Sequence, residues 1–549
     1  MIDTQAAGRR LIVAAISLVA IGLFFRFQIA QGFRFTFGDS NDGFIEIALL
    51  EHWNNVFHGL ENWNQIGYFH PVPKTLGYND AYLLYGVFYS VFRTLGLDIF
   101  LSGEMVNLTV RAIGYAAFYG ACRRILDLDW RWAAMGALLF TISDNAYLHA
   151  LHQQLLSVSF APVIALLLHG TLTSLAAPRR GPVLAWGTGL IAAYAAWLMT
   201  AFYMAWYCGL FGALFCFFWV IFSAPEGRRL LVRQLRDQAL PILGLCVLFA
   251  LANRPFLRLY MPKAAETGMH HYADILIFSP SLLDVFHVGS GNLLWGWLDT
   301  AVIRYLRPSF PPFSERTTGF PLGILAVFGG AAIWLWRKPH PSASVARALC
   351  AAIVVSWALF LHFGPFTGYS LVYQFVPGAK ATRVIARYQI FLAAPLIAVA
   401  MAFLASEAGR LTKWGCALLC LFLTAEQINN TPQIRLDRPA QLARLAAIPP
   451  PSPACKAFYI SKADPAQSDP NNPADGIIRH NIDAMLLAEL LHVPTINGYS
   501  TFQPPGYDLY FPGRPDYPDR IRRYAAQYQV TGLCGLDMAA DRWSAWSGD

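Results

Sequence analysis

The chain has 549 residues, of which 56% are hydrophobic and only 13% are charged, and its formal net charge is +8. A mean hydropathy of +0.41 excludes an ordinary soluble enzyme and indicates a protein of the membrane. The surplus of positive charge falls in loops between apolar segments, so it needs no nucleic-acid partner to explain it.

Apolar runs of about 20 residues recur along the chain, which is the length that an α-helix needs to cross a bilayer. The first run follows Arg9 and Arg10 and is not followed by a small-residue cleavage site, so we interpret it as a retained span. We expect an α-helical polytopic membrane protein with about eleven transmembrane helices, near residues 10–29, 104–122, 132–148, 155–176, 184–203, 205–223, 239–253, 321–337, 347–363, 388–405 and 413–427.

Short loops rich in arginine fall on one side of this arrangement, together with the N terminus. The loops contain Arg123, Arg124, Arg131, Arg179, Arg180, Arg228, Arg229, Arg233, Arg236, Arg337, Lys338, Arg347, Arg410 and Lys413. The positive-inside rule makes that side cytoplasmic. This orientation predicts a multi-pass protein of the bacterial inner membrane, whose domain 1–428 has periplasmic loops at 30–97, 253–321 and 364–387. The apolar stretch 81–95 then cannot cross, and we expect it to be an interfacial or re-entrant helix.

An acidic motif, FGDSNDG at residues 37–43, begins the first of these loops. Two carboxylates beside a bilayer indicate chemistry on a lipid-linked substrate. We expect Asp39 to be a general base, and Asp42 to be either its partner or the cap of a helix that begins near Gly43. The two acids could also hold a divalent cation such as Mg²⁺ or Mn²⁺, although their spacing alone indicates a metal only weakly. Residues 45–57 then predict an amphipathic helix with its apolar face on lipid.

Cations at the outer ends of other spans are the candidates for binding a phosphate. Arg383 and Arg387 are four residues apart and share one face of a helix that enters the membrane. They either grip a phosphate or extend to lipid headgroups. His149 and His152 occupy a short outer turn, where they are either phosphate donors or ordinary turn residues.

Four further residues could line a path for the acceptor substrate. These are His70, Asp80, Glu315 and Tyr499. For two of them the sequence also supports a structural role, because Asp80 could cap the helix that begins at Ala81 and Glu315 could form a local ion pair with Arg316.

The tail, residues 429–549, has the size and pattern of a small periplasmic α/β domain. After a proline-rich linker at 449–453 we expect a strand at 457–460, helices at 483–491 and 519–528, and a strand at 529–533. Cys455 and Cys534 are the only cysteines in this tail and could form a disulfide in an oxidising compartment. The aromatic residues near 499–511 either stack on an acceptor glycan or pack the tail onto the loops.

These features in this order resemble the GT-C superfamily of polytopic membrane glycosyltransferases. The resemblance is carried by the acidic motif after the first span, an interfacial helix, and the segments YFHP at 68–71 and YND at 78–80. Pro377-Gly378 before the two arginines, and NGYS at 497–500, are similar to a bacterial branch of that superfamily. The resemblance implies a polyprenyl-phosphate sugar donor and a catalytic base in the first loop, a role that Asp39 inherits. The chain lacks the adjacent Asp-Asp of simpler members, which leaves the choice between Asp39 and Asp42 open.

The leading functional hypothesis is an inverting glycosyltransferase on the periplasmic face. It would transfer a sugar from a polyprenyl-phosphate carrier to a cell-envelope glycan, glycolipid or protein. One alternative is a polysaccharide ligase or polymerase that uses a polyprenyl-diphosphate-linked substrate, and another is a non-catalytic glycan or lipid transporter. Transporters place ionisable residues inside their spans, whereas here such residues gather at the outer rim, which favours interfacial chemistry.

Overall fold

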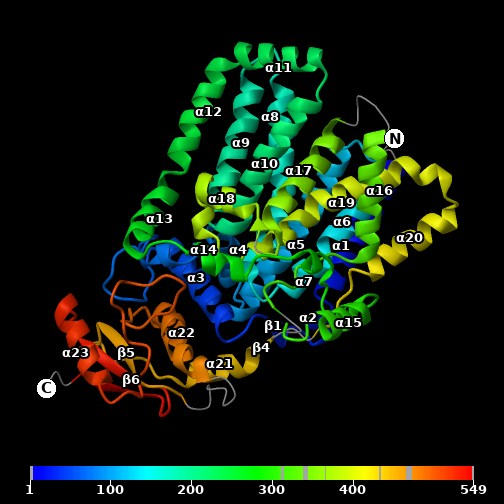
Figure 1. Ribbon diagram of the computed structural model, residues 1–549. Coiled ribbons are helices and arrows are strands. Elements are labelled where there is room, and N and C mark those ends of the chain that lie inside the picture. The colour runs from blue at the N-terminus through cyan, green and yellow to red at the C-terminus, as the bar shows by residue number, and fades with distance from the viewer. Residues whose placement is uncertain are drawn as a thin grey trace.

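The computed structural model describes residues 4–310, 314–337, 344–364, 366–431, 435–464 and 473–546. Long helices form a bundle, and a small sheet with its own helices lies beyond one end of it (Figure 1). Of the residues considered above, Lys338 lies outside the described ranges.

The bundle is built from apolar helices, each of which overlaps one of the eleven predicted spans. They are α1 (Thr4–Phe24), α5 (Ile99–Arg124), α6 (Trp130–Thr141), η2 (Gln153–Phe160) continuing into α8 (Ala161–Ser174), α9 (Gly181–Leu198), α10 (Phe202–Phe222), α12 (Ala239–Ala252), α16 (Leu322–Arg337), α17 (Ser344–Phe360), α19 (Tyr388–Glu407) and α20 (Lys413–Ala425).

Five of these helical segments in the described residues are long and apolar enough to cross a membrane. They are Ala7–Phe24, Gln153–Ser174, Gly181–Leu198, Phe202–Phe222 and Ile385–Arg410. Helices α16, α17 and α20 are shorter but apolar. Helix α5 is long enough, but it carries Glu104, Asn107 and Arg111, all of them buried, on its inner face. The protein is therefore a helical membrane protein, and the number of eleven crossings stays a prediction.

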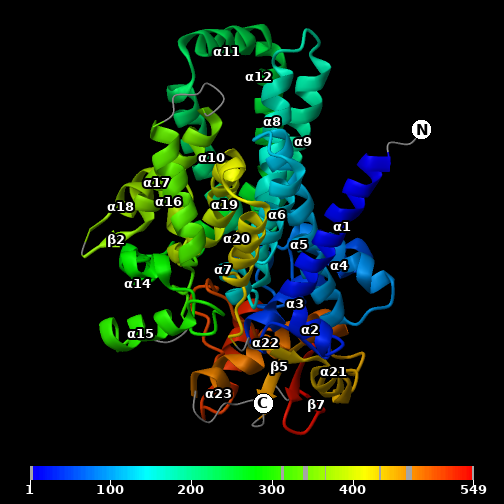
Figure 2. The ribbon, with the colours of Figure 1, turned by 90° about the vertical axis from the view of Figure 1, so that its right-hand side faces the viewer.

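The most basic helix lies at the end of the bundle that is farthest from the tail. Helix α11 (Pro225–Asp237) carries four arginines and meets α12 at a bend of 74°. Figures 1 and 2 show α11 across one end of the bundle and the tail beyond the other. The acidic first loop is on the tail side, so basic and acidic segments are separated along the bundle, as the charge pattern predicts.

The first loop contains α2 (Arg26–Ala30), β1 (Phe35–Phe37), α3 (Asp42–Phe57), η1 (Thr75–Tyr78) and α4 (Leu83–Thr94). Helix α4 has 12 residues, too few for a crossing that takes about 20. One of its faces buries Tyr85 and Tyr89, while Val87 and Val91 on the other face are exposed. This two-sided helix is what the sequence predicts for an interfacial segment.

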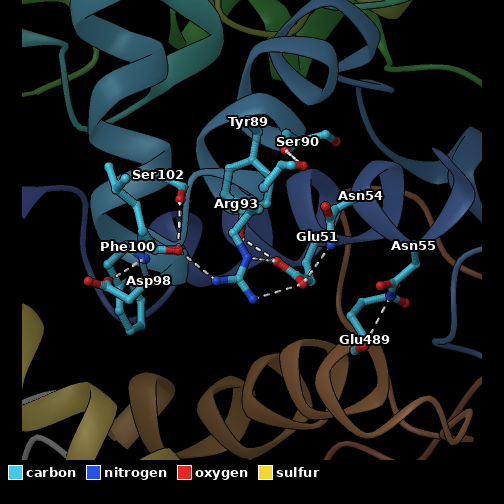
Figure 3. A network of polar contacts seen from close by, with 12 residues as sticks. Glu51, Asn54, Asn55, Tyr89, Ser90, Arg93, Asp98, Phe100, Ser102 and Glu489 are labelled. Atoms are coloured by element: carbon cyan, nitrogen blue, oxygen red, sulfur yellow. Dashed lines mark hydrogen bonds and ion pairs between the residues drawn. The ribbon is translucent and has the colours of Figure 1, made fainter. Parts of the chain in front are cut away.

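Helix α3 is buried on nearly all sides, so the prediction that its apolar face lies on lipid is wrong. Trp53 is only 4% exposed, and its indole N–H donates to the carbonyl of Ala81. Glu51 accepts hydrogen bonds from Tyr89 Oη at 2.5 Å and from Arg93 Nε at 3.0 Å (Figure 3). The remaining face is covered by α22 (Pro473–Leu491) of the tail, a segment too distant in sequence for local periodicity to reveal.

The tail is joined to the first loop by a two-stranded sheet. Strand β1 pairs antiparallel with β4 (Arg435–Asp437), with Thr36 opposite Leu436. The tail then contains α21 (Arg438–Ala447), β5 (Ala457–Lys462), α22, α23 (Tyr517–Tyr528), β6 (Leu533–Asp537) and β7 (Arg542–Ala545). Strand β5 is parallel to β6, which is antiparallel to β7. Strand β6 begins at the position where the predicted strand ends, and β7 was not predicted.

The joined strands and a second set of contacts fix the tail on the first loop. Cys455 and Cys534 form a disulfide at the start of the β5–β6 pair. His70 donates its backbone N–H to the Thr495 carbonyl at 2.9 Å. The rings of Phe69 and Tyr507 pack with their centroids 4.7 Å apart. Tyr507 is 7% exposed, so this aromatic residue packs the tail onto the loop, one of the two roles expected for its segment.

The second and third outer loops lie beside the end of the bundle that faces the tail (Figure 2). They contain α13 (Arg254–Thr267), α14 (Tyr272–Ile277), η3 (Leu282–Phe286), α15 (Gly296–Leu306), β2 (His362–Phe363), β3 (Phe366–Thr367), α18 (Tyr369–Phe375), η5 (Ala379–Ala381) and η6 (Ile385–Arg387). The short α7 (Asp144–Leu148) and η7 (Ala408–Arg410) complete the described helices.

Candidate functional site

The acidic motif folds back on itself because two glycines approach closely. Gly38 has a φ of +115°, a backbone conformation that residues other than glycine rarely adopt. A Cβ at Gly43 would lie 3.1 Å from the Cα of Gly38 and 3.3 Å from the side chain of Leu436. The turn is thus held between strand β1 and the tail, and it presents Asp39 and Asp42 together at the start of α3.

Asp39, and not Asp42, satisfies the free N–H groups at the start of α3. Its Oδ1 accepts hydrogen bonds from the backbone N–H groups of Asn41 at 2.9 Å and Gly43 at 3.1 Å. The capping role that the sequence offered to Asp42 is therefore corrected, because the tight turn brings the Asp39 carboxylate to these groups first. Asp42 is the first helical residue, and its side chain is 49% exposed.

Asp42 begins a row of alternating charges. Its Oδ2 lies 3.1 Å from Nδ1 of His152, an ion-pair contact outside hydrogen-bond geometry, and Nε2 of the same ring lies 3.3 Å from Oε1 of Glu315. Glu315 then accepts two hydrogen bonds from Arg387, at 2.8 and 3.0 Å. We call Asp42, His152, Glu315 and Arg387 the charge row. Its members come from α3, the turn before η2, the second outer loop and η6, directly before α19.

The predicted local pair between Glu315 and Arg316 is wrong. The two side chains point to different partners, because Arg316 binds the buried carboxylate of Asp284 together with Arg307. Glu315 is left to pair with Arg387 and His152. A neighbour in sequence is thus replaced by partners that only the fold brings near.

Hydrogen bonds from buried neighbours hold the segments that carry the row. Nε2 of His149 lies 3.1 Å from the carbonyl of Thr317, two residues beyond Glu315. Glu46 accepts the N–H of Gln153, the residue after His152, and the hydroxyl of Tyr82, both at 2.9 Å. His149 is 1% exposed, and burial lowers its pKa to about 4, so it is neutral at pH 7. Its contact with Thr317 fixes the turn to the segment that carries Glu315, and a phosphate contact by His149 stays a prediction.

Electrostatics favour the charged forms within the row. Burial and Arg387 act against protonation of His152, but its contacts with Asp42 and Glu315 prevail and raise its pKa to about 9. Burial likewise acts against the charged carboxylates, yet His152 lowers the pKa of Asp42, and Arg387 lowers the pKa of Glu315. At neutral pH Asp42 and Glu315 are therefore negatively charged, and His152 and Arg387 are positively charged.

The pKa of Asp39 is shifted in the opposite direction from that of Asp42. Burial, and then the charge of Asp42, raise the pKa of the Asp39 carboxyl above its ordinary value. A raised pKa makes Asp39 the stronger proton acceptor of the two acids, which is what a general base requires. Among the described residues no hydrogen bond reaches its second oxygen, Oδ2.

Arg383 and Arg387, the two predicted phosphate ligands, differ in their surroundings. The Arg387 side chain is 10% exposed and engaged with Glu315. Arg383 is exposed, and its guanidinium lies 5.4 Å from the centre of the Phe278 ring. Tyr203 connects them, because its hydroxyl accepts the backbone N–H of Arg383 at 2.7 Å while the Arg387 guanidinium lies 5.9 Å from its ring. An exposed arginine thus stands beside the charge row, at the outer end of α19.

The predicted acceptor-path residues are divided between two places. Asp80 lies near the charge row: its Oδ1 accepts the N–H of Phe202 at 2.9 Å, so it caps α10 and not the α4 helix that the sequence favoured. Burial raises its pKa to about 6, while Phe202 and Arg387 lower it. His70 and Tyr499 lie in the contact between the first loop and the tail, where Tyr499 donates its backbone N–H to Met485 Sδ. Only Glu315 of the four is a member of the row.

Asp39 and Asp42 do not make a strong metal site on their own. Asp39 Oδ1 is taken by backbone N–H groups and Asp42 Oδ2 by His152. Within the described residues, three metal-ligating side chains converge in one group only, His52, Glu61 and Glu489, elsewhere along α3. Sequence reasoning missed that group, and also Glu46 and Tyr203. The available signal for Glu46 was an acid within the short run of apolar residues at 44–50.

No family model and no curated protein sequence matches this chain. In structure it is similar to the arabinofuranosyltransferase AftD from Mycobacteria, with a TM-score of 0.49 and 16% identity over 95% of this chain. The chain spans 33% of the length of AftD. It is also similar to ArnT from Cupriavidus metallidurans, with a TM-score of 0.35 and 14% identity over 89% of this chain and 86% of ArnT. At TM-scores below 0.5 these similarities assign neither a family nor an activity to this chain.

Proposed function

We propose that this protein is an inverting glycosyltransferase that transfers a sugar from a polyprenyl-phosphate carrier to a cell-envelope acceptor on the periplasmic face of the inner membrane. The observation that carries the proposal is the convergence of Asp39 and the charge row. Residues from four distant segments meet within ion-pair distance at the outer ends of apolar helices. Asp39 is half-buried and Asp42 beside it is 49% exposed, so a substrate hydroxyl could reach both acids next to the paired charges.

In the proposed reaction Asp39 is the general base. The acceptor hydroxyl loses its proton to Asp39 as its oxygen attacks the anomeric carbon from the face opposite the phosphate. The bond between that carbon and the phosphate oxygen breaks, and its electron pair leaves with polyprenyl phosphate. The anomeric configuration is inverted because attack and departure occur on opposite faces. Asp42 supports this step by keeping the pKa of Asp39 raised.

Arg383 is proposed as the first phosphate ligand, because it is exposed and is not ion-paired with any described residue. A guanidinium can bind two phosphate oxygens at once and stabilise the charge that develops on the leaving group. Arg387 is the second ligand and would become available as the incoming phosphate competes with Glu315. The polyprenyl chain would remain among the apolar helices, since Arg383 lies near the start of α19.

The proposed orientation is supported by charge. The arginines of α11 lie at the end of the bundle opposite the tail (Figure 1). If that basic end is cytoplasmic, the acidic motif and the tail face the periplasm. The disulfide between Cys455 and Cys534 is compatible with an oxidising compartment.

The test is a transfer assay with purified protein in detergent. A panel of radiolabelled, short-chain polyprenyl-phosphate sugars is offered with cell-envelope extract as acceptor, and the release of free polyprenyl phosphate is measured. We expect release from at least one donor only when acceptor is present, and none from the Asp39→Asn, Asp42→Asn double variant. Runs with Mg²⁺, Mn²⁺ or EDTA determine whether the two acids need a cation.

The same assay separates the alternatives. Release of polyprenyl diphosphate from diphosphate-linked oligosaccharides, with no release from the polyprenyl-phosphate sugars, would indicate a ligase or polymerase. Binding of the carrier without release of polyprenyl phosphate would indicate a transporter. Full activity of the double variant would refute the proposed mechanism. Arg34→Ala is the matched control, because Arg34 is a charged residue of the same loop. Its side chain is 60% exposed, and its one ion-pair partner among the described residues is Asp437.

A further inference from the structure

A second polar cluster lies along α3, away from the charge row. His52 of α3, Glu61 of the loop that follows it and Glu489 of α22 each direct one possible metal-ligand atom toward the others, and these atoms all lie within 4.8 Å of one another. The side chains of His52 and Glu489 are fully buried, and that of Glu61 is 17% exposed. The cluster joins the first loop to the tail.

The cluster has too little positive charge for its two carboxylates. Within the described residues, His52 is the only basic side chain within 4 Å of Glu61 or Glu489. Burying a carboxylate is costly unless a cation compensates it. The same helix shows the usual solution nearby, where Arg93 pairs with the buried Glu51 (Figure 3). Among the described residues, no arginine or lysine compensates the carboxylate of Glu489 in this way.

The atoms around the cluster orient its lone pairs inward. Nε2 of His52 lies 3.3 Å from the carbonyl oxygen of Trp63, so a proton on Nε2 is held there and Nδ1 is left facing the carboxylates. Oε1 of Glu489 accepts the N–H of Gly67 at 2.9 Å. The Asn55 amide donates to Oε1 of Glu61 at 2.9 Å and to Oε2 of Glu489 at 3.3 Å. Metal-binding histidines and carboxylates are commonly fixed by hydrogen bonds of this kind.

We propose that His52, Glu61 and Glu489 bind one divalent transition-metal cation, with Zn²⁺ the best match, and that this cation fastens α3 to α22. One imidazole and two carboxylates are a common donor set for such ions, and water would complete the coordination. Nδ1 of His52 lies 2.6 Å from Oε2 of Glu61 and 3.8 Å from Oε2 of Glu489. Ligands on a tetrahedral zinc are about 3.4 Å apart, so small side-chain rotations suffice.

The first experiment measures metal in the full-length protein, purified in detergent through an affinity tag that contains no histidine. We expect about one zinc per chain by plasma mass spectrometry. X-ray absorption at the zinc edge should show one imidazole and oxygen ligands at about 2.0–2.2 Å. Absence of metal after purification, together with no uptake of added Zn²⁺, would overturn the proposal and leave a carboxyl pair that shares a proton. A sulfur shell would overturn it as well, by placing the ion at cysteines.

Variants locate the ion. His52→Ala and Glu489→Gln should lose the zinc. His58→Ala should keep it, because His58 is an exposed histidine directly after α3. The Asp39→Asn, Asp42→Asn double variant should also keep it, so failure of this proposal is distinguishable from failure of the proposed transferase. If the cluster variants do not fold, EDTA treatment of the wild-type protein replaces them. Removal of the ion should lower Tm by about 5 °C, and Zn²⁺ should restore it. An unchanged Tm and unchanged zinc content in foldable variants would refute the assignment.

Discussion

Helix α3 carries two polar clusters that differ in how their charges are balanced. The charge row at its start alternates acids with His152 and Arg387, and its first acid is 49% exposed. The cluster at His52 is buried, joins two carboxylates to one imidazole, and lacks an arginine or lysine within the described residues. The charges of the row are balanced and one of its acids is exposed. The His52 cluster is buried and has more negative than positive charge.

The difference shows how function can be inferred from the balance of charge in a cluster. Neither cluster is distinguished by its residue types, since both combine acids with histidine. What separates them is exposure and the number of cations. An exposed acid beside a balanced row indicates a reaction with an incoming molecule, whereas a buried deficit of positive charge indicates an ion retained for stability.

The largest expected effect distinguishes Asp39 from Asp42 as the base. Asp39→Asn should lower kcat about 10³-fold, because the proton acceptor is lost while asparagine still caps α3. Asp42→Asn should retain much more activity and shift the acid limb of the pH–rate profile to lower pH, since the charge that raises the pKa of Asp39 is gone. Release of polyprenyl phosphate measures both. Equal losses in the two variants would show that the acids act as one unit.

The next effect is on stability and comes from His152. Its pKa is raised from 6.5 to about 9, so the stabilisation from its protonation is fully present below pH 6.5 and is lost as the pH rises through about 9. The loss should approach about 3 kcal/mol. Thermal unfolding from pH 6 to 10 should show this decline in the wild type and in His58→Gln, but not in His152→Gln. Parallel curves for all three proteins would contradict it.

A smaller effect concerns the pair formed by Arg387 and Glu315. A double-mutant cycle with Arg387→Ala and Glu315→Ala should give a coupling energy of about 2 kcal/mol in unfolding, because the pair is bidentate and mostly buried. The exposed pair of Arg34 and Asp437 is the comparison and should give about 0.5 kcal/mol. Additive losses in the first cycle would show that the charge row is held by packing alone.

The smallest effect concerns Arg383. Arg383→Ala should raise KM for the lipid-linked donor about tenfold, the cost of one charged hydrogen bond at an exposed site, with a modest change in kcat. Arg383→Lys should recover part of the loss. Lys380→Ala removes an exposed cation from the same loop and should leave KM unchanged. A lowered kcat at constant KM would instead assign Arg383 to the transition state.

Local signals explain which parts of the fold were predictable from the sequence. Hydrophobic length located the helices of the bundle. Asp39, Asp42, His152, Glu315 and Arg387 were all selected as candidates from the loops that the charge pattern assigns to the outer side. Their pairing was not predictable. For Glu315 the sequence offered either an acceptor path or a local pair with Arg316, and the fold pairs it with Arg387.

Contacts between distant segments account for the errors. The apolar face of α3 was expected to lie on lipid, because the pattern of residues 45–57 does not indicate that the tail covers this helix. Asn55 and Glu489, which bond across that contact, are 434 residues apart in sequence. The His52 cluster has no regular spacing for the same reason, since two of its ligands come from one loop and the third from α22.

The pairing of β1 with β4 also sets an order for assembly. Residues 35–37 have left the ribosome long before their partner strand at 435–437 exists. At roughly 5–20 residues per second, the first loop waits on the order of tens of seconds for the tail to be synthesised. During that interval the turn that carries Asp39 and Asp42 lacks the support of Leu436, so the geometry of the proposed site is complete only after β4 has been synthesised. A nascent chain arrested before β4 would therefore contain the helices of the bundle but lack the geometry of the proposed site.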